Sequence, residues 1–166
     1  MNITFAPNGR LQIDNARIIF RNFRGEGSRY NRDGDRNFSV VIDDEDIANA
    51  LQNDVNKYGV GWNVKIRPPR EEGDIPFMHL PVKVKFNDRG PGIHLTTGNR
   101  TVKLTEDTVD MLDEIDICSV NMDIRPYDNE VNGKPFRTAY LHSIHVIQEV
   151  DRFASTLYNN DDEDVF

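Results

Sequence analysis

Two segments of the chain alternate apolar and polar residues, and this period of two restricts the fold more than any other pattern. The segments are residues 62–67 and 82–86. Their basic positions are Lys65, Arg67, Lys83 and Lys85. Successive side chains of a strand point to opposite faces of a sheet, so each segment places apolar groups on one face and cations on the other. The pattern predicts two half-buried strands with a basic outer face.

A further pair of strands is predicted over residues 11–23 and 37–42, which are rich in Ile, Val and Phe. The residues between them, 24–36, are rich in Gly and Arg and are predicted to form a long hairpin loop. Residues 68–77 contain three prolines and are expected to leave the sheet as a stiff excursion, because proline cannot donate a ladder hydrogen bond.

One amphipathic helix is predicted in the middle of the chain, where Asp43 and Asp44 can cap its first turn. Its apolar face has helical spacing and consists of Ile47, Leu51, Val55 and Tyr58. Gly59 is placed to terminate it. A short second helix is expected after Thr105, with Val109 and Leu112 turned inward.

The remaining strands are predicted as two hairpins. Their ranges are 93–97 with 101–104, turning at 98–99, and 114–125 with 137–150, turning at 132–135. Several strands, one central helix and no alternation of strand with helix predict a mainly β fold, a closed or partly closed antiparallel β-barrel. A β-sandwich remains the alternative, because periodicity alone does not separate the two.

The length of 166 residues suits one domain with a real core plus a tail. No apolar run approaches the roughly 20 residues that span a bilayer, and the first residues lack the pattern of a signal peptide. We therefore expect a cytoplasmic protein without membrane contact. Cys118 is the single cysteine, which excludes an internal disulfide and predicts a buried, inert thiol.

The formal net charge is −8, but the charge is unevenly distributed. Residues 1–41 hold seven Arg against four acids, and residues 65–103 hold eight basic residues against four acids. Residues after 103 hold four basic residues against fifteen acids. Salt screens exposed charges beyond about 10 Å at 0.1 M, so the basic segments can bind phosphates despite the acidic remainder.

Single-stranded nucleic acid is bound by cations that follow the phosphates and by flat rings on which bases stack. The candidates that combine these properties are Arg17, Arg21, Arg24, Arg29, Tyr30, Arg32, Arg36, Trp62, Lys65, Arg67, Arg70, Lys83, Lys85 and Arg89. Each cation taken singly also fits the wet side of an ordinary strand. Trp62 fits either the core or a stacking platform, whereas Phe20, Phe38 and Phe86 are predicted to be core.

The chain ends in a run of acids followed by an aliphatic residue and a terminal phenylalanine. These residues are Asp161, Asp162, Glu163, Asp164, Val165 and Phe166. Mutually repelling acids cannot form a core, so we expect a solvated tail over residues 153–166 after a domain over residues 1–152. A terminal Phe beside acids suits a partner pocket with a basic rim, although a plain solubility tag would have the same composition.

This ending resembles the C-terminal tip of bacterial and phage single-stranded-DNA-binding proteins, with Val165 where the cellular proteins usually have Pro. Residues 17–24 and 63–70 also resemble strands of the phage-encoded proteins of this family, which are of the OB-fold type. The resemblance implies an OB-fold-like barrel that coats single-stranded DNA during replication, recombination and repair. It further implies a tail that recruits replication or recombination proteins, and a possible homodimer. It implies neither a cofactor nor an enzymatic activity.

Three alternatives remain open from the sequence. An acidic DNA mimic or partner-binding protein would use the negative surface itself, and a phage structural β-barrel could share the strand pattern. A Mg²⁺-dependent nuclease would need a cluster such as Asp110, Asp113, Glu114 and Asp116. His142 and His145 lie three apart on a predicted strand and would face opposite sides unless a bulge intervenes, so no metal site is expected.

Overall fold

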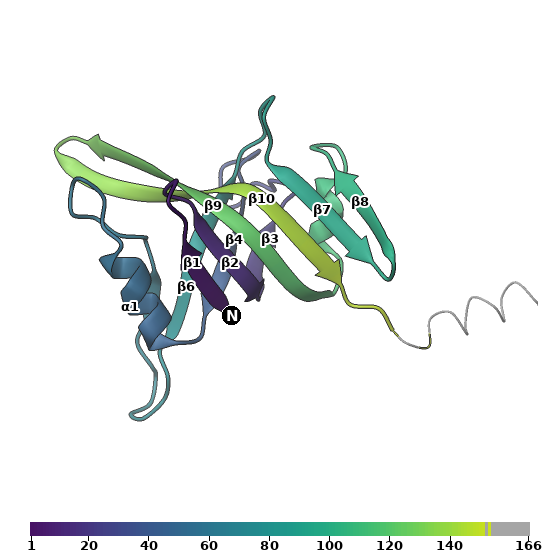
Figure 1. The fold of residues 1–166 in the computed structure, drawn as a ribbon. Helices are drawn as coiled ribbons and strands as arrows, with labels where there is room; N and C mark the ends of the chain where they lie inside the picture. The colour runs from purple at the N-terminus through teal and green to yellow at the C-terminus, as the bar shows by residue number, and fades with distance from the viewer. Residues whose placement is uncertain (152, 154–166) are drawn as a thin grey trace, which may run out of the picture.

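The alternating segments are strands of one ten-stranded sheet in a computed structural model that describes residues 1–151 and 153 (Figure 1). The strands are β1 (Asn2–Phe5), β2 (Leu11–Ala16), β3 (Ile18–Asn22), β4 (Arg36–Ile42), β5 (Lys65–Arg67), β6 (Phe77–Val84), β7 (Gly92–Thr97), β8 (Arg100–Leu104), β9 (Ile117–Val131) and β10 (Lys134–Gln148). The helices are α1 (Glu45–Asn53) and a 3-10 helix η1 (Val109–Asp113). The mainly β class with one α-helix and a short second helix is confirmed.

The strands follow the order β1-β2-β9-β10-β6-β4-β3, with β5 added to β6 and the β7/β8 hairpin added to β10. The described strands β1 and β3 at the two ends are not paired with each other, so the sheet is not closed. The long strand β10 pairs in parallel with β6 at Tyr140 and with β7 from Ser143 to Ile147. An antiparallel sheet was predicted throughout, and these two parallel pairings are the exception.

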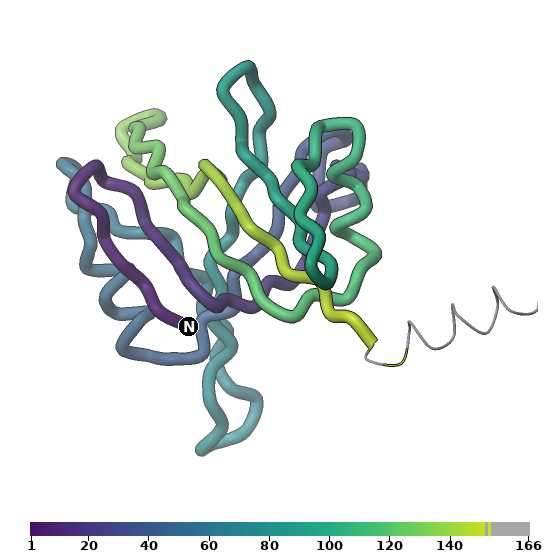
Figure 2. Tube along the Cα trace, turned by 45° about the vertical axis from the view of Figure 1, so that its right-hand side comes forward, coloured from purple at the N-terminus to yellow at the C-terminus, as the bar shows by residue number. Residues whose placement is uncertain are grey.

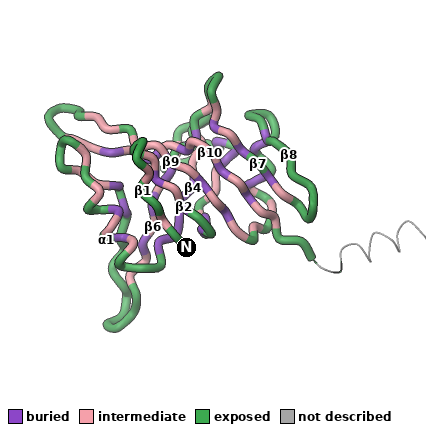
Figure 3. The backbone as a smooth tube through the Cα atoms, in the orientation of Figure 1, coloured by how far each residue is buried: buried purple, intermediate pink, exposed green. Residues whose placement is uncertain are grey.

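Strand β6 shows the predicted alternation, because Val82 and Val84 are buried while Lys83 and Lys85 are exposed. The excursions at its two ends, residues 68–76 and 86–91, project from opposite sides of the body (Figure 2). Strand β5 is shorter than predicted, and Ile66 is 49% exposed although the pattern placed it inside. β5 pairs only with residues 77–79 of β6, and its three residues are exposed, whereas β6 alternates buried with more exposed positions (Figure 3).

Helix α1 begins where predicted, since the Asp44 carboxylate accepts from the Asp46 backbone N–H at 2.7 Å. It ends at Asn53, one turn early, and Val55 and Tyr58 are exposed residues outside it. The Asn56 side-chain oxygen accepts from two backbone N–H groups, those of Tyr58 and Val60. This local turn competes with continuation of the helix.

A buried arginine joins the segment after α1 to the β9/β10 hairpin. Arg137 donates to both Asp128 oxygens, at 2.7 and 3.2 Å, and to the Asp54 carbonyl at 2.7 Å. Burial alone would raise the pKa of Asp128, but hydrogen bonds from Arg137 and Asn56 lower it below its ordinary value. Trp62 lies under the Arg137 guanidinium, is 3% exposed and donates its indole N–H to Asp54.

The predicted strand over residues 11–23 is broken at Arg17 into β2 and β3, and β3 itself contains a bulge. Ile19 pairs with Ser39 and Asn22 pairs with Asn37, so Phe20 and Arg21 together lie opposite one residue of β4. A bulge re-aims side chains. Phe20 is 61% exposed, and its assignment to the core was therefore wrong.

The remaining elements follow the prediction closely. Val109 and Leu112 of η1 are buried, as expected. The β7/β8 hairpin turns at Gly98 and Asn99, and the β9/β10 hairpin turns at 132–133 but is longer than predicted at its tip. Phe38 is buried and Phe86 is partly buried against the core. Cys118 is exposed, contrary to expectation. None of the helices in the described part is long and apolar enough to cross a membrane.

Candidate nucleic-acid interface

A groove of about 580 Å³ lies over the outer face of β6. It is bounded by the 24–36 loop, by β4 and by one side chain of β10, Tyr140. The side chains that can meet a ligand are Tyr30, Arg32, Arg36, Lys83, Lys85 and Tyr140. We call this the β6 groove. The pleat of β6 and the long loop after β3 therefore bring together residues that are more than fifty positions apart.

A second hollow, of about 510 Å³, continues from the β6 groove and shares Lys85 with it. It adds Arg10, Arg89, Arg125 and His142. We call it the basic extension. Within the described residues, Lys83, Lys85, Arg32 and Arg89 form no ion pair. Arg36 is already engaged, since it pairs with Glu106 at 3.1 Å and donates to the Phe23 carbonyl. The two hollows together form a track of mostly unpaired cations.

Aromatic rings line the same track. Tyr30 is 90% exposed in the loop, and the Arg29 guanidinium lies 5.7 Å from its ring centroid. Tyr140 lies beneath the Arg125 guanidinium at 4.8 Å and meets Tyr127 edge to face, with centroids 6.0 Å apart. Tyr30 and Tyr140 therefore share the β6 groove with Arg32, Lys83 and Lys85, and unpaired bases and their phosphates require rings and cations together.

A third group of rings, which sequence reasoning missed, stands on the same outer face of β6. Phe77 and His79 occupy the alternate positions that lead to Lys83, and Phe20 reaches them from β3, with its ring centroid 6.3 Å from Phe77 and 5.5 Å from His79. We call these three residues the Phe20 cluster. Lys65 and Arg67 flank it, because they pair in register with His79 and Phe77.

The His79 ring is held in place from β4. Its Nδ1 is hydrogen-bonded to the Ser39 hydroxyl at 3.0 Å. Burial, followed by the charges of Arg67 and Lys65, lowers the pKa of His79 below its ordinary value of 6.5. The ring is therefore predominantly neutral at pH 7.

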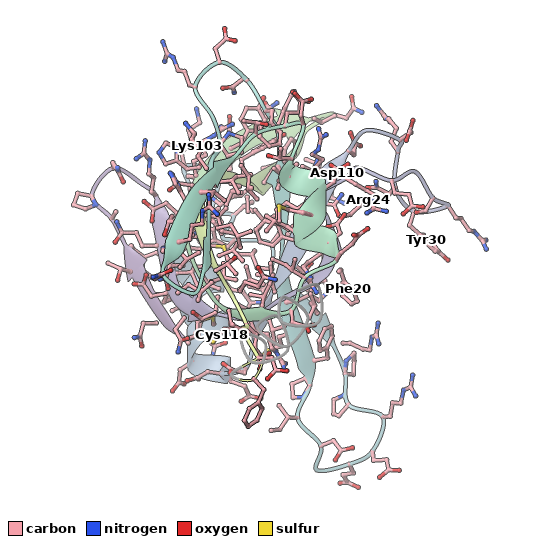
Figure 4. The ribbon with its side chains drawn as sticks, turned by 90° about the vertical axis from the view of Figure 1, so that its right-hand side faces the viewer. Phe20, Arg24, Tyr30, Lys103, Asp110 and Cys118 are labelled. Atoms are coloured by element: carbon pink, nitrogen blue, oxygen red, sulfur yellow. The ribbon has the colours of Figure 1, made fainter. Side chains whose placement is uncertain are left out.

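Two predicted cations are committed to the fold instead. Arg21 donates to the carbonyls of Leu112 and Ile115, both at 2.7 Å. Arg24 pairs with Glu114 and lies 3.8 Å from the Asp113 carboxylate, on the side of the molecule where η1 packs (Figure 4). These contacts raise the pKa of Arg24, chiefly through the hydrogen bond to Glu114. We call this contact the β3–η1 seam.

The structure therefore sorts the predicted residues into three sets. Those brought together in the β6 groove and its extension are Tyr30, Arg32, Arg36, Lys83, Lys85 and Arg89. Those outside the hollows but near other rings or in loops are Arg29, next to Tyr30, Lys65 and Arg67, which flank the Phe20 cluster, and Arg70, in the 68–76 excursion. Those elsewhere are Arg17, Arg21, Arg24 and Trp62. Trp62 is removed from the candidate interface because its ring is buried. The tail residues 161–166 lie outside the described residues.

Two of the acids considered for a Mg²⁺ cluster, Asp113 and Glu114, are engaged by other residues. Across residues 1–151 and 153, no group of three His, Cys, Asp or Glu side chains could hold a metal ion. The Asp113 carboxylate accepts from the backbone N–H groups of Phe23 and Arg24, and Glu114 is paired with Arg24. A bulge does occur at His142, but His145 is hydrogen-bonded to Thr96 at 2.6 Å.

The comparison with protein families gives one match across most of the chain. Residues 2–162 match the family described as "Putative phage ssDNA-binding domain". No curated protein matched the chain.

Solved structures show the same fold at low sequence identity. The single-stranded DNA-binding protein from bacteriophage Enc34 in complex with ssDNA is 13% identical, with a TM-score of 0.54 over 92% of this chain and 94% of that chain. Its C-terminally truncated form is 14% identical, with a TM-score of 0.53 over 90% and 92%. The TM-scores show a shared fold, and at identities this low the ligand of this chain has to be argued from its own surface.

Proposed function

Because the chain belongs to the family of phage ssDNA-binding domains, we propose that it binds single-stranded DNA without sequence preference, along the β6 groove and its basic extension. The observation that carries the proposal is the continuity of these two hollows, which share Lys85. A site lined by rings and unpaired cations attracts phosphates and bases together.

The phosphates would lie against Lys83, Lys85, Arg32 and Arg89, which form no ion pair in the described part of the chain. Tyr30 and Tyr140 would receive bases, and each base stacked on a ring contributes about 1–3 kcal/mol. Every base has a flat face, so stacking does not discriminate among sequences. In a duplex these faces are already stacked on one another, and we expect weaker binding.

The acidic tail supplies the second half of the proposal. Residues 161–166 carry four acids and a terminal Phe, and the groove carries the opposite charge. We propose that residues 153–166 act as a tail that competes with DNA for the groove, and that DNA releases the tail to recruit proteins of replication, recombination or repair. Such a role would be exercised in the host cytoplasm, where phage DNA is copied.

Fluorescence anisotropy with labelled oligo-dT and with a duplex of equal length tests both halves. We expect oligo-dT to bind more tightly than the duplex, and deletion of residues 157–166 to tighten oligo-dT binding. Equal affinity for the two forms of DNA would contradict the stacking model, and weaker binding after truncation would contradict competition by the tail.

The rival functions give different results in the same assay. An acidic DNA mimic would show no affinity for oligo-dT at low salt. A structural β-barrel would sediment as large assemblies and ignore DNA, whereas the homodimer expected from the resemblance would sediment as two copies.

A further inference from the structure

The Phe20 cluster is an exposed aromatic surface whose composition neither the core nor the backbone explains. Phe20 adopts φ 52°, in the left-handed region that a bulky residue rarely occupies. Phe20 is 61% exposed, and its ring meets those of Phe77 and His79 in edge-to-face geometry. Asn or Gly would adopt this backbone more readily. Strained residues that persist on a surface concentrate at ligand sites.

The cluster combines exposed rings with neighbouring cations, a combination that suits a polyanion carrying flat groups. The Arg67 guanidinium lies 5.7 Å from the Phe77 ring centroid, and Lys65 pairs in register with His79. Both cations are exposed and form no ion pair with any described residue. His79 is fixed by Ser39, so its ring is held at a set angle, tilted 32° from Phe77.

The cluster lies in line with the β6 groove. Phe77, His79 and Lys83 are on one face of the same strand, and Lys83 is six positions after Phe77, a rise of about 20 Å. We propose that the Phe20 cluster is a second stacking site, separate from the groove, which receives unpaired bases of the same DNA strand while Lys65 and Arg67 contact its phosphates. This inference rests on the proposed function and extends the DNA path toward β5.

A length dependence follows from this geometry. An oligonucleotide of about 4 nucleotides, at the lower end of site sizes for single folds of this size, is too short to fill the groove and also span the roughly 20 Å to the cluster, whereas one of about 16 nucleotides reaches both sites. The gain in affinity between the two lengths should therefore depend on the Phe20 cluster.

The test is the substitution Phe20→Asn in the full-length chain, because Asn removes the ring and tolerates φ 52°. We expect an unchanged or higher melting temperature and about a tenfold weaker affinity for the longer oligo-dT, with little change for the shorter one. Phe5→Asn is the matched control, since Phe5 is 43% exposed on β1 and lines neither hollow, and it should leave DNA binding unchanged.

A second readout is cross-linking with oligo-dT that carries 5-iodouracil, followed by mass spectrometry. Cross-links at Phe77 or His79 are expected, and their loss in Phe20→Asn supports the site.

If Phe20→Asn binds both lengths like the wild type while Lys83→Gln/Lys85→Gln weakens both, the cluster is not a DNA site and the groove remains the DNA site. If wild-type protein fails to bind oligo-dT, the proposed function itself is wrong. Loss of self-association in Phe20→Asn without loss of DNA binding would assign the cluster to a protein contact instead.

Discussion

The outer face of β6 and the β3–η1 seam both carry cations on or beside strands, yet they use them in opposite ways. Lys83 of β6 and Lys85, just after its end, line an open groove and form no ion pair with described residues. At the seam, Arg21 binds two carbonyls and Arg24 binds two carboxylates. A cation is available to DNA only where the fold leaves it without an acceptor.

The largest expected effect is a loss of folding stability when a cation of the β3–η1 seam is replaced. Arg21→Met removes two charged hydrogen bonds to main-chain carbonyls, and we expect the free energy of unfolding to fall by about 2 kcal/mol, measured by urea denaturation. Arg17→Met is the control, because Arg17 is exposed and lines neither hollow. Neither change should alter oligo-dT affinity in the folded protein. If the Arg21→Met protein were stable but bound DNA more weakly, the claim that seam cations serve the fold and not DNA binding would be wrong.

A smaller effect is expected at the rim of the groove. Tyr30→Ala should weaken oligo-dT binding by about 1 kcal/mol, roughly fivefold, because one stacked base loses its ring. Tyr58→Ala is matched, since Tyr58 is also an exposed tyrosine beside a cation, Lys57, at 5.1 Å. Anisotropy titration of both variants compares them directly. Equal losses would show that any exposed tyrosine has this effect and that the groove is not special.

The smallest expected effect is a pH dependence of stability that originates at His79. Its pKa in the folded state is lowered, so between that pKa and 6.5 the unfolded state binds more protons. Stability should therefore fall as the pH drops below 6.5, and His79→Gln should remove this slope. The ring is partly exposed, which keeps the effect small. Urea denaturation of both proteins between pH 7.5 and pH 5 measures it, and identical slopes would exclude His79 as the source.

The regular part of β6 was predictable because an unbroken pleat fixes which side chains face outward. Lys83 and Lys85 were placed correctly for this reason. Phe20 and Arg21 were placed incorrectly, because a bulge in β3 changes the faces that strict alternation assigns to their side chains. The early end of α1 depends on a local turn at Asn56, and helical spacing alone does not reveal it.

Other parts of the candidate site depend on contacts that no local pattern encodes. Tyr140 reaches the groove because β10 pairs in parallel with β6 at Lys83, across more than fifty residues of sequence. The basic extension likewise joins Arg10 to Arg89 and Arg125. The sequence left two positions open for Trp62, the core and a stacking platform. The structure buries it in the core, as its alternation with apolar residues indicated.

The most direct test of the central claim is the salt dependence of oligo-dT binding for three proteins measured side by side. These are the wild type, Lys83→Gln/Lys85→Gln, and Lys57→Gln/Lys103→Gln, whose lysines are exposed outside both hollows. Each phosphate contact on a single strand contributes about −0.7 to the slope of log K against log salt. Our account predicts a slope shallower by about 1.4 for the first pair and unchanged for the second. Equal slopes for the two double variants would contradict it.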